Sequence, residues 1–334
     1  MKVSKFKLVP LMAAVGLAWA GSATAVPVVG INYLGTGSFG PGCVGCIYAS
    51  NWVNFTDTGQ DSGPTTAGSA LGTTHTFTTQ AAISGMSNNG TPTSPGTPLN
   101  VNTPAGFEIT KQVKFNDIVT NVFVAPSGAT TLTFGNTAQT GIPLGVTGQS
   151  NNLSIYLDNL GDGTIADRAG PGNGADCYGN GGAGNPTCPQ HNNLPGGDGI
   201  LILQGHVIAN TSAFTAFPPG TGNGSYQITF ALDYVDPNYV DVNNLPVNGG
   251  TGERVFSDLF TGTLVQPPTA AALGFQPPLH EWDGTAFGTN AAGDQNGFKV
   301  DSSQTFGVPE PTTVALLGFG LAAFGFARRG KKQS

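Results

Sequence analysis

The 51 glycines and 24 prolines of this 334-residue chain constrain its fold more than any other feature. Both residue types interrupt helices, and the strong helix formers are scarce, because charged residues make up 9% of the chain and only three methionines occur. Hydrophobic residues reach 39%, with 20 phenylalanines, which is enough to form a core. The composition excludes a helix-rich fold and a charge-driven disordered chain, and it favours β-strands joined by long Gly-, Pro- and Thr-rich loops.

Apolar residues at every second position mark the expected strands. This period-two pattern is typical of half-buried strands and occurs in three runs: 107–115, 153–157 and 226–234. Two other stretches, 118–125 and 200–208, are apolar on both parities, which is typical of strands buried on both faces. The sequence therefore predicts an all-β fold, an antiparallel β-sandwich, with residues 106–308 as its core and residues 26–105 as a loop-rich N-terminal part of the body.

Residues 1–25 have the three parts of a secretory signal peptide. A basic start, formed by Lys2, Lys5 and Lys7, precedes the apolar stretch 8–20. The small residues Ala23 and Ala25 then frame a cleavage site. We expect the Sec machinery to export the chain and the signal helix to be removed after Ala25, so that the mature protein begins at Val26.

The C-terminal end combines three features in a fixed order. The tripeptide Pro309-Glu310-Pro311 is followed by the apolar run Val314–Ala327 and then by four cations: Arg328, Arg329, Lys331 and Lys332. The run is shorter than the roughly 17–25 residues of a membrane-spanning helix, but cations at its end are expected to stay in the cytoplasm. Both ends of the chain therefore predict export of the body, with transient inner-membrane anchoring through a short apolar helix at residues 312–327.

Residues 309–334 resemble the PEP-CTERM sorting signal of Gram-negative bacteria, which has the same tripeptide, apolar helix and basic end. The resemblance implies recognition by exosortase, an inner-membrane cysteine transpeptidase that would cut near the tripeptide and pass the body to the cell surface or extracellular matrix. Proteins with this tail are often linked to exopolysaccharide production, biofilm and floc formation. The body, with its Gly-Phe-Lys-Val-Asp stretch at 297–301, also resembles flocculation-associated PEP-CTERM proteins.

Removal of both terminal signals leaves an acidic body. Between residues 26 and 308 the chain keeps five basic and 18 acidic residues, a net charge of −13. This charge excludes electrostatic binding to nucleic acid or to an anionic surface. Divalent cations and neutral polymers such as extracellular polysaccharide are the favoured partners.

The four cysteines of the mature chain predict two disulfides, because the protein is exported and the count is even. They are Cys43, Cys46, Cys177 and Cys188. Of the three possible pairings we favour Cys177–Cys188, which closes a Gly/Asn-rich loop, with Cys43–Cys46 as the remainder. Zinc binding by the two pairs, a redox-active C-x-x-C and free thiols are the alternatives.

The best metal candidate is the segment 158–167, which is similar to a calcium loop. Its carboxylates Asp158, Asp162 and Asp167 are the oxygen ligands that calcium prefers. Leu160 occupies the third position, however, and the closing glutamate of such a loop is missing. A second acidic cluster follows the 226–234 run and consists of Asp233, Asp236, Asn238 and Asp241. The alternative for both clusters is ordinary turn chemistry.

No catalytic motif is evident in the sequence. The four histidines, His75, His191, His206 and His280, are scattered, and neither H-E-x-x-H nor G-x-S-x-G occurs. We therefore expect a non-catalytic surface or matrix protein that contributes to biofilm or floc formation and associates with polysaccharide. The alternatives are an exported glycan-active hydrolase and a calcium-dependent carbohydrate-binding module.

Overall fold

The structure is a computed structural model, which describes residues 28–54, 57–61, 70–88, 91–92, 107–139, 152–158, 199–217, 221–243, 245–248, 250–265 and 296–306. The signal helix, the C-terminal helix and the calcium-loop residues Asp162 and Asp167 lie outside these ranges. Within them, all regular secondary structure is β-strand and every pairing is antiparallel. The predicted all-β antiparallel fold is confirmed.

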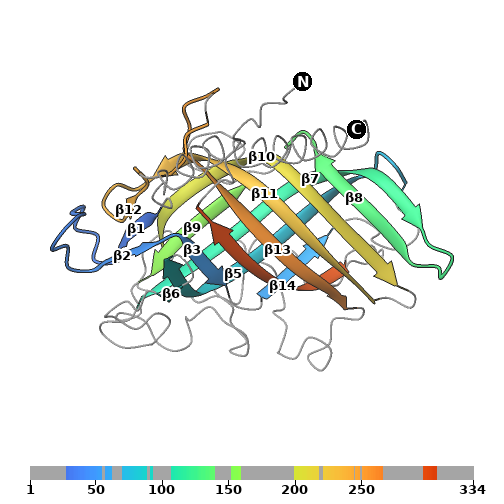
Figure 1. Cartoon of the computed structure of the whole chain (residues 1–334), viewed down its shortest axis with the longest axis horizontal. Coiled ribbons are helices and arrows are strands. Elements are labelled where there is room, and N and C mark those ends of the chain that lie inside the picture. The colour runs from blue at the N-terminus through green and yellow to red at the C-terminus, as the bar shows by residue number, and fades with distance from the viewer. Residues whose placement is uncertain are drawn as a thin grey trace, which may run out of the picture.

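The strands form one large and one small sheet (Figure 1). The eleven-stranded sheet contains β3 (Asn51–Asn54), β4 (Asp57–Asp61), β5 (Thr74–Asn88), β6 (Thr91–Pro92), β7 (Glu108–Val124), β8 (Thr130–Asn136), β9 (Leu153–Asp158), β10 (Ile200–Phe217), β11 (Thr221–Val235), β13 (Val255–Val265) and β14 (Asn296–Thr305). The three-stranded sheet contains β1 (Val29–Asn32), β2 (Cys46–Ala49) and β12 (Val240–Asp241).

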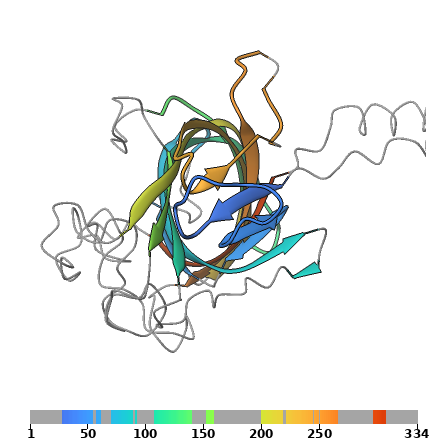
Figure 2. The same cartoon turned by 90° about the vertical axis from the view of Figure 1, so that its left-hand side faces the viewer.

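The large sheet closes on itself. Its strand order runs β3-β5-β4-β14-β13-β11-β10-β8-β7-β9, and β5 also pairs with β7, so the path of hydrogen-bonded strands returns to its start. Figure 2 shows this ring end-on, with β1, β2 and β12 lying across the end that faces the viewer. Opposite walls of this closed sheet face each other across one apolar core, which gives the sandwich-like arrangement that the sequence predicted.

Aromatic side chains from opposite walls fill the core. The ring of Phe77 on β5 stacks on Tyr226 of β11 with centroids 4.7 Å apart, and it also contacts Phe115 of β7 at 5.2 Å. Near the small sheet, Phe306 is fully buried and meets Trp52 edge-on at 4.9 Å. The backbone N–H of Phe306 donates to the Ser50 carbonyl, so the chain is held in the core up to this residue.

The predicted alternation in β11 holds as far as Leu232 and then breaks. Tyr226, Ile228 and Phe230 are at most 2% exposed, whereas Tyr234 is 37% exposed. A register shift in the pairing of β11 with β10 leaves Asp233 as an extra residue, which is a β-bulge. Because a bulge moves the following residues out of the regular alternation, Tyr234 no longer points into the core.

The expectation that the 118–125 stretch is buried on both faces is wrong from Thr120 onward. These residues extend β7, but Phe123 and Val124 are 59% and 60% exposed. The register shift between Val119 and Asn121 in the pairing with β8 interrupts the alternation there as well. The strand itself was predicted correctly, and only its burial was not.

A buried ion pair joins two walls of the closed sheet. The Lys111 ammonium on β7 lies 2.8 Å from the Asp258 carboxylate on β13, and both side chains are fully buried. Lys111 also donates to the Ser302 hydroxyl at 2.9 Å and lies 4.4 Å above the Phe260 ring. Burial raises the pKa of the Asp258 carboxyl above its usual range, and the Lys111 charge opposes this rise. The carboxylate therefore depends on the cation that faces it.

We expect Lys111→Met to lower the free energy of unfolding by about 3–5 kcal/mol, because it leaves a buried carboxylate without its cation. Urea denaturation followed by tryptophan fluorescence measures this change. The double variant Lys111→Met/Asp258→Leu removes both charges and is expected to recover most of the lost stability. Equal stability of the single and double variants would contradict this role of the pair.

Candidate functional site

The small sheet carries a row of three residues at the end of the closed sheet. Gly30 in the central strand β1 pairs with Tyr48 of β2 on one side and with Asp241 of β12 on the other. A Cβ atom at position 30 would lie 2.8 Å from the Tyr48 ring and 3.3 Å from the Asp241 Cβ. Glycine is therefore required for the Tyr48 ring to lie over the strand beside Asp241.

The loop between β1 and β2 forms one wall of a pocket above this row. Five of its glycines have positive φ, among them Gly40 at 113°, a conformation that other residues rarely adopt. The Gly40 N–H donates to the Tyr48 hydroxyl at 2.7 Å, which fixes the loop to the tyrosine. Phe39 and Pro41 on either side of Gly40 supply the apolar lining of this wall.

A disulfide and two hydrogen bonds also fix the conformation of this loop. Cys43 and Cys46 form a disulfide with their Cα atoms 5.6 Å apart, which confirms this pairing. The buried Asn32 amide donates to the Thr36 hydroxyl at 2.6 Å and to the Ser38 carbonyl at 3.0 Å. The backbone that presents Phe39 is thus constrained from both ends of the loop.

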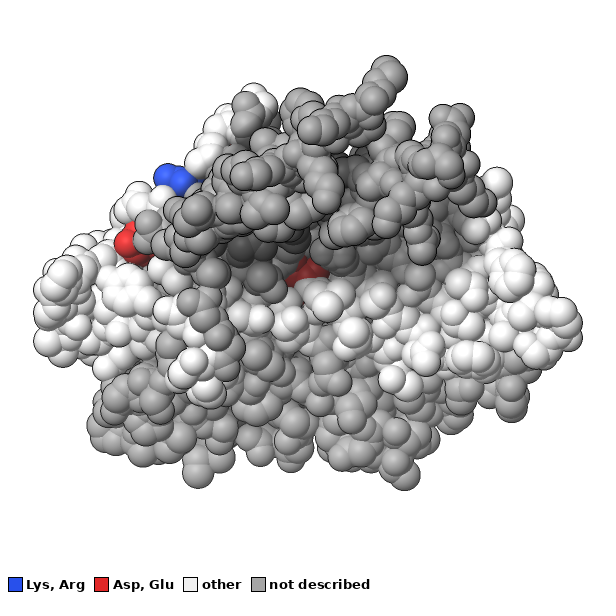
Figure 3. Space-filling model, in the orientation of Figure 1, with Lys and Arg blue, Asp and Glu red and all other residues white. Residues whose placement is uncertain are grey.

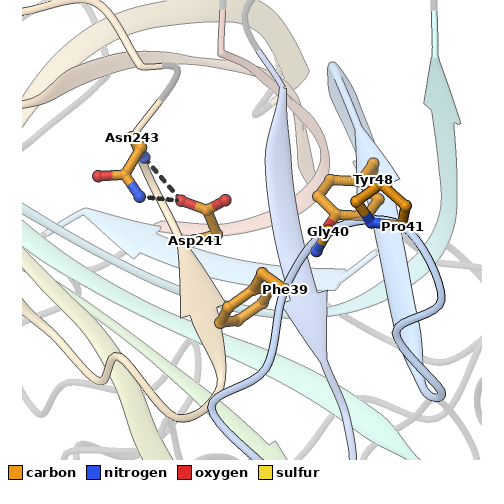
Figure 4. Close-up of a pocket in the computed structure, with 6 residues that line it drawn as sticks. All are labelled: Phe39, Gly40, Pro41, Tyr48, Asp241 and Asn243. Carbon is orange, nitrogen blue, oxygen red and sulfur yellow. Dashed lines mark hydrogen bonds between the residues drawn. The ribbon is translucent and has the colours of Figure 1, made fainter.

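Asp241 and Asn243 form the polar wall. The backbone N–H and the side-chain amide of Asn243 both donate to Asp241 Oδ1, at 3.0 and 2.7 Å. Figure 4 shows this pair on one side of the pocket, Gly40, Pro41 and Tyr48 on the other, and Phe39 between them. These residues border an open pocket of about 620 Å³. Aromatic faces beside a carboxylate and an amide suit a ligand that has both apolar faces and hydroxyl groups.

The residues of the second acidic cluster have separate hydrogen-bond partners in the structure and do not converge on one site. Asp236 Oδ1 accepts a hydrogen bond from the Asn238 N–H at 2.9 Å, and Asp241 accepts from Asn243. Asp233 contacts the His206 ring instead, at 2.8 Å. Turn chemistry, the alternative interpretation of this cluster, accounts for Asp236 and Asp241.

Most of the other predicted site residues lie outside the described ranges. These are Ala23, Ala25, Val26, Asp162, Asp167, Cys177, Cys188, Pro309, Glu310, Pro311, Arg328, Arg329, Lys331 and Lys332. Asp158 ends β9 opposite Glu108 of β7. His75 is buried in the closed sheet, where its ring meets Phe134 edge-on. The pocket residues Phe39, Tyr48 and Asn243 were not predicted, since they match no motif.

Comparison with protein families identifies the tail of the chain. The family described as the PEP-CTERM protein-sorting motif matches residues 307–331. The chain therefore carries a PEP-CTERM sorting motif, as its sequence predicted, and this motif indicates an exported protein that is targeted to exosortase and to the cell envelope or surface. Comparison with curated proteins and with solved structures gave no significant match. None of the described segments forms an apolar helix of the length that a bilayer requires.

We expect Gly30→Ala to displace the Tyr48 ring and to break its hydrogen bond with the Gly40 N–H, at a cost of about 1 kcal/mol. Amide hydrogen exchange at Gly40 measures the loss directly and should accelerate, as it should in Tyr48→Phe. Gly85→Ala is the matched control, because a Cβ there meets no atom within 4 Å. Unchanged exchange at Gly40 in Gly30→Ala would show that the row does not position Tyr48.

Proposed function

We propose that this protein is a non-catalytic component of the cell surface or extracellular matrix, which binds polysaccharide in the pocket and contributes to biofilm or floc formation. The sorting motif indicates that the protein is exported to the cell envelope or surface. The observation that carries the binding function is the pairing of two half-buried aromatic rings, Phe39 and Tyr48, with the Asp241–Asn243 pair around one open pocket.

The chemistry of the pocket matches a sugar ring. The apolar face of a sugar packs against an aromatic ring, and its hydroxyl groups exchange hydrogen bonds with a carboxylate and an amide. The backbone N–H and one N–H of the side-chain amide of Asn243 are directed to Asp241 Oδ1. The second carboxylate oxygen, the amide oxygen and the other amide N–H are then left for the hydroxyl groups of a ligand. An open pocket also admits an internal unit of a long polymer.

Binding is favoured over cleavage by the number of carboxylates. Most glycoside hydrolases use two carboxyl groups that flank the scissile bond. Asp241 is the one carboxylate among the residues described as lining the pocket. A single acid is sufficient to bind a hydroxyl group but not for the usual hydrolytic mechanism.

The low charge of the chain supports a neutral polymer as the ligand. Charged residues make up 9% of the sequence, and the face of the molecule in Figure 3 shows few charged side chains among the described residues. An acidic body would repel a polyanion, whereas a neutral polysaccharide meets no such barrier. Many copies on one surface, each binding weakly, would hold a long polymer firmly.

We expect Phe39→Ala and Tyr48→Ala each to weaken binding to polysaccharide isolated from the producing cells by about tenfold. Affinity electrophoresis in gels containing that polysaccharide measures the change, and Tyr234→Ala, an exposed tyrosine outside the pocket, is the control. A deletion strain should flocculate less and be restored by the wild-type gene but not by Phe39→Ala.

Two results would contradict this function. Binding of both pocket variants at wild-type strength would exclude the pocket as the site. Release of soluble sugars from the polysaccharide by the wild-type protein would show that it is an enzyme.

We expect replacement of Pro309-Glu310-Pro311 by alanines to prevent processing by exosortase, so that the body stays with the cell envelope at a larger mass. Immunoblots of cell fractions and medium measure this. The control carries alanines at Pro267 and Pro268, two prolines outside the motif. Normal-sized body in the medium from the motif variant would refute exosortase processing.

A further inference from the structure

Three potential metal ligands, none of which lines the pocket, converge on neighbouring strands. His206 lies on β10, Asp233 on β11, and Glu253 shortly before β13, and these strands are adjacent in the closed sheet. Their ligand atoms all lie within 4.8 Å of one another. Asp233 is only 8% exposed, whereas His206 is 31% exposed, so the group is built into the sheet but open to solvent on one side.

The β-bulge in β11 creates this arrangement. Asp233 is the extra residue where the register with β10 shifts between Gln204 and Gly205, and a bulge changes the direction of the side chain that it carries. A Cβ at position 205 would lie 2.5 Å from the Ala231 carbonyl oxygen. Glycine at 205 therefore permits the close approach of the two strands beside the bulge, next to His206.

Backbone hydrogen bonds hold Glu253 beside the same bulge. The Leu232 N–H donates to the Arg254 carbonyl at 2.8 Å. This hydrogen bond joins the residue before Asp233 to the residue after Glu253. The Asn248 N–H donates to the carbonyl of Glu253 itself, also at 2.8 Å. Each of the three side chains is thus presented by a different, hydrogen-bonded segment.

Distances within the group are close to those in the coordination sphere of a transition metal. His206 Nδ1 lies 2.8 and 3.0 Å from the two Asp233 oxygens. Ligand atoms about 2.0–2.2 Å from one zinc ion are separated by roughly 3.0–3.5 Å, so these two residues need only a small adjustment. Glu253 is half-buried, and its longer side chain supplies the remaining movement.

Charge favours a cation at this position. Two carboxylates face one imidazole, and their repulsion is not balanced when the imidazole is neutral. Burial raises the pKa of the Asp233 carboxyl, and the Glu253 charge raises it further, while the hydrogen bond and charge of His206 oppose the rise. A divalent ion would relieve this repulsion.

We infer that His206, Asp233 and Glu253 form a binding site for a divalent transition metal of the zinc type. One imidazole nitrogen with two carboxylate oxygens suits zinc, whereas calcium and magnesium prefer oxygen ligands alone. Three protein ligands leave at least one position for water. Because the ligands come from three neighbouring segments, the ion would fasten β10, β11 and the segment before β13 together. This site is independent of the polysaccharide pocket.

Titration of the full-length protein with Zn²⁺, in competition with a chromophoric chelator, tests the site. We expect His206→Gln and Glu253→Gln to remove one zinc equivalent or to weaken it by at least about tenfold. Asp236→Asn is the control, since Asp236 is a nearby carboxylate whose bond to the Asn238 N–H an asparagine can also make. Excess Ca²⁺ should not displace the zinc.

Two further measurements separate loss of the site from loss of the fold. Zinc should raise the melting temperature of the wild-type protein and of Asp236→Asn, with reversal by EDTA, but not that of His206→Gln. Co²⁺ should give a visible absorption band that His206→Gln lacks, although its circular dichroism is that of the wild type. Equal zinc affinity of wild type and His206→Gln, or displacement by Ca²⁺, would overturn the proposal.

Discussion

The pairing of β5 with β7 is the interaction on which the rest of the structure depends. It closes the ring of strands, so that every strand of the large sheet except the short β6 has hydrogen-bonded neighbours on both sides. An open sheet of this size would expose two long edges to pairing with other chains. Closure also creates a single interior, in which phenylalanine rings from opposite walls meet and in which Lys111 and Asp258 are removed from water. The buried ion pair therefore exists only because the sheet is closed.

A second consequence of closure is that sites form at the ends and on the outer face of the sheet, since the interior is filled. The small sheet lies across one end and carries the pocket (Figure 2). On the outer face, the bulge at Asp233 breaks the regular alternation and brings three polar side chains together. In both places a glycine, Gly30 or Gly205, allows a close approach that a Cβ atom would prevent.

The sequence allowed the fold class to be predicted, because apolar alternation such as that of Tyr226, Ile228 and Phe230 depends only on neighbouring residues. It did not reveal β5, where threonines and glutamine take many positions of the pattern although Phe77 points into the core. The Cys43–Cys46 disulfide was predicted as the pair that remained once Cys177 and Cys188 were assigned to each other, and the structure contains it. The row of Tyr48, Gly30 and Asp241 was not, since its members come from distant parts of the chain and meet only through strand register. The tail motif was recognisable because it is contiguous.

The burial of Phe306 limits the length of chain between the folded body and the cleavage site. Its ring is fixed in the core against Trp52, and only residues 307 and 308 separate it from Pro309. An extended chain spans at most about 3.6 Å per residue, so the three steps from Phe306 to Pro309 can cover at most roughly 11 Å. A transpeptidase that acts there must work in direct proximity to the closed sheet. The enzyme therefore meets the folded body as well as the tripeptide. The short connection between the two limits the directions from which the enzyme can reach the cleavage site.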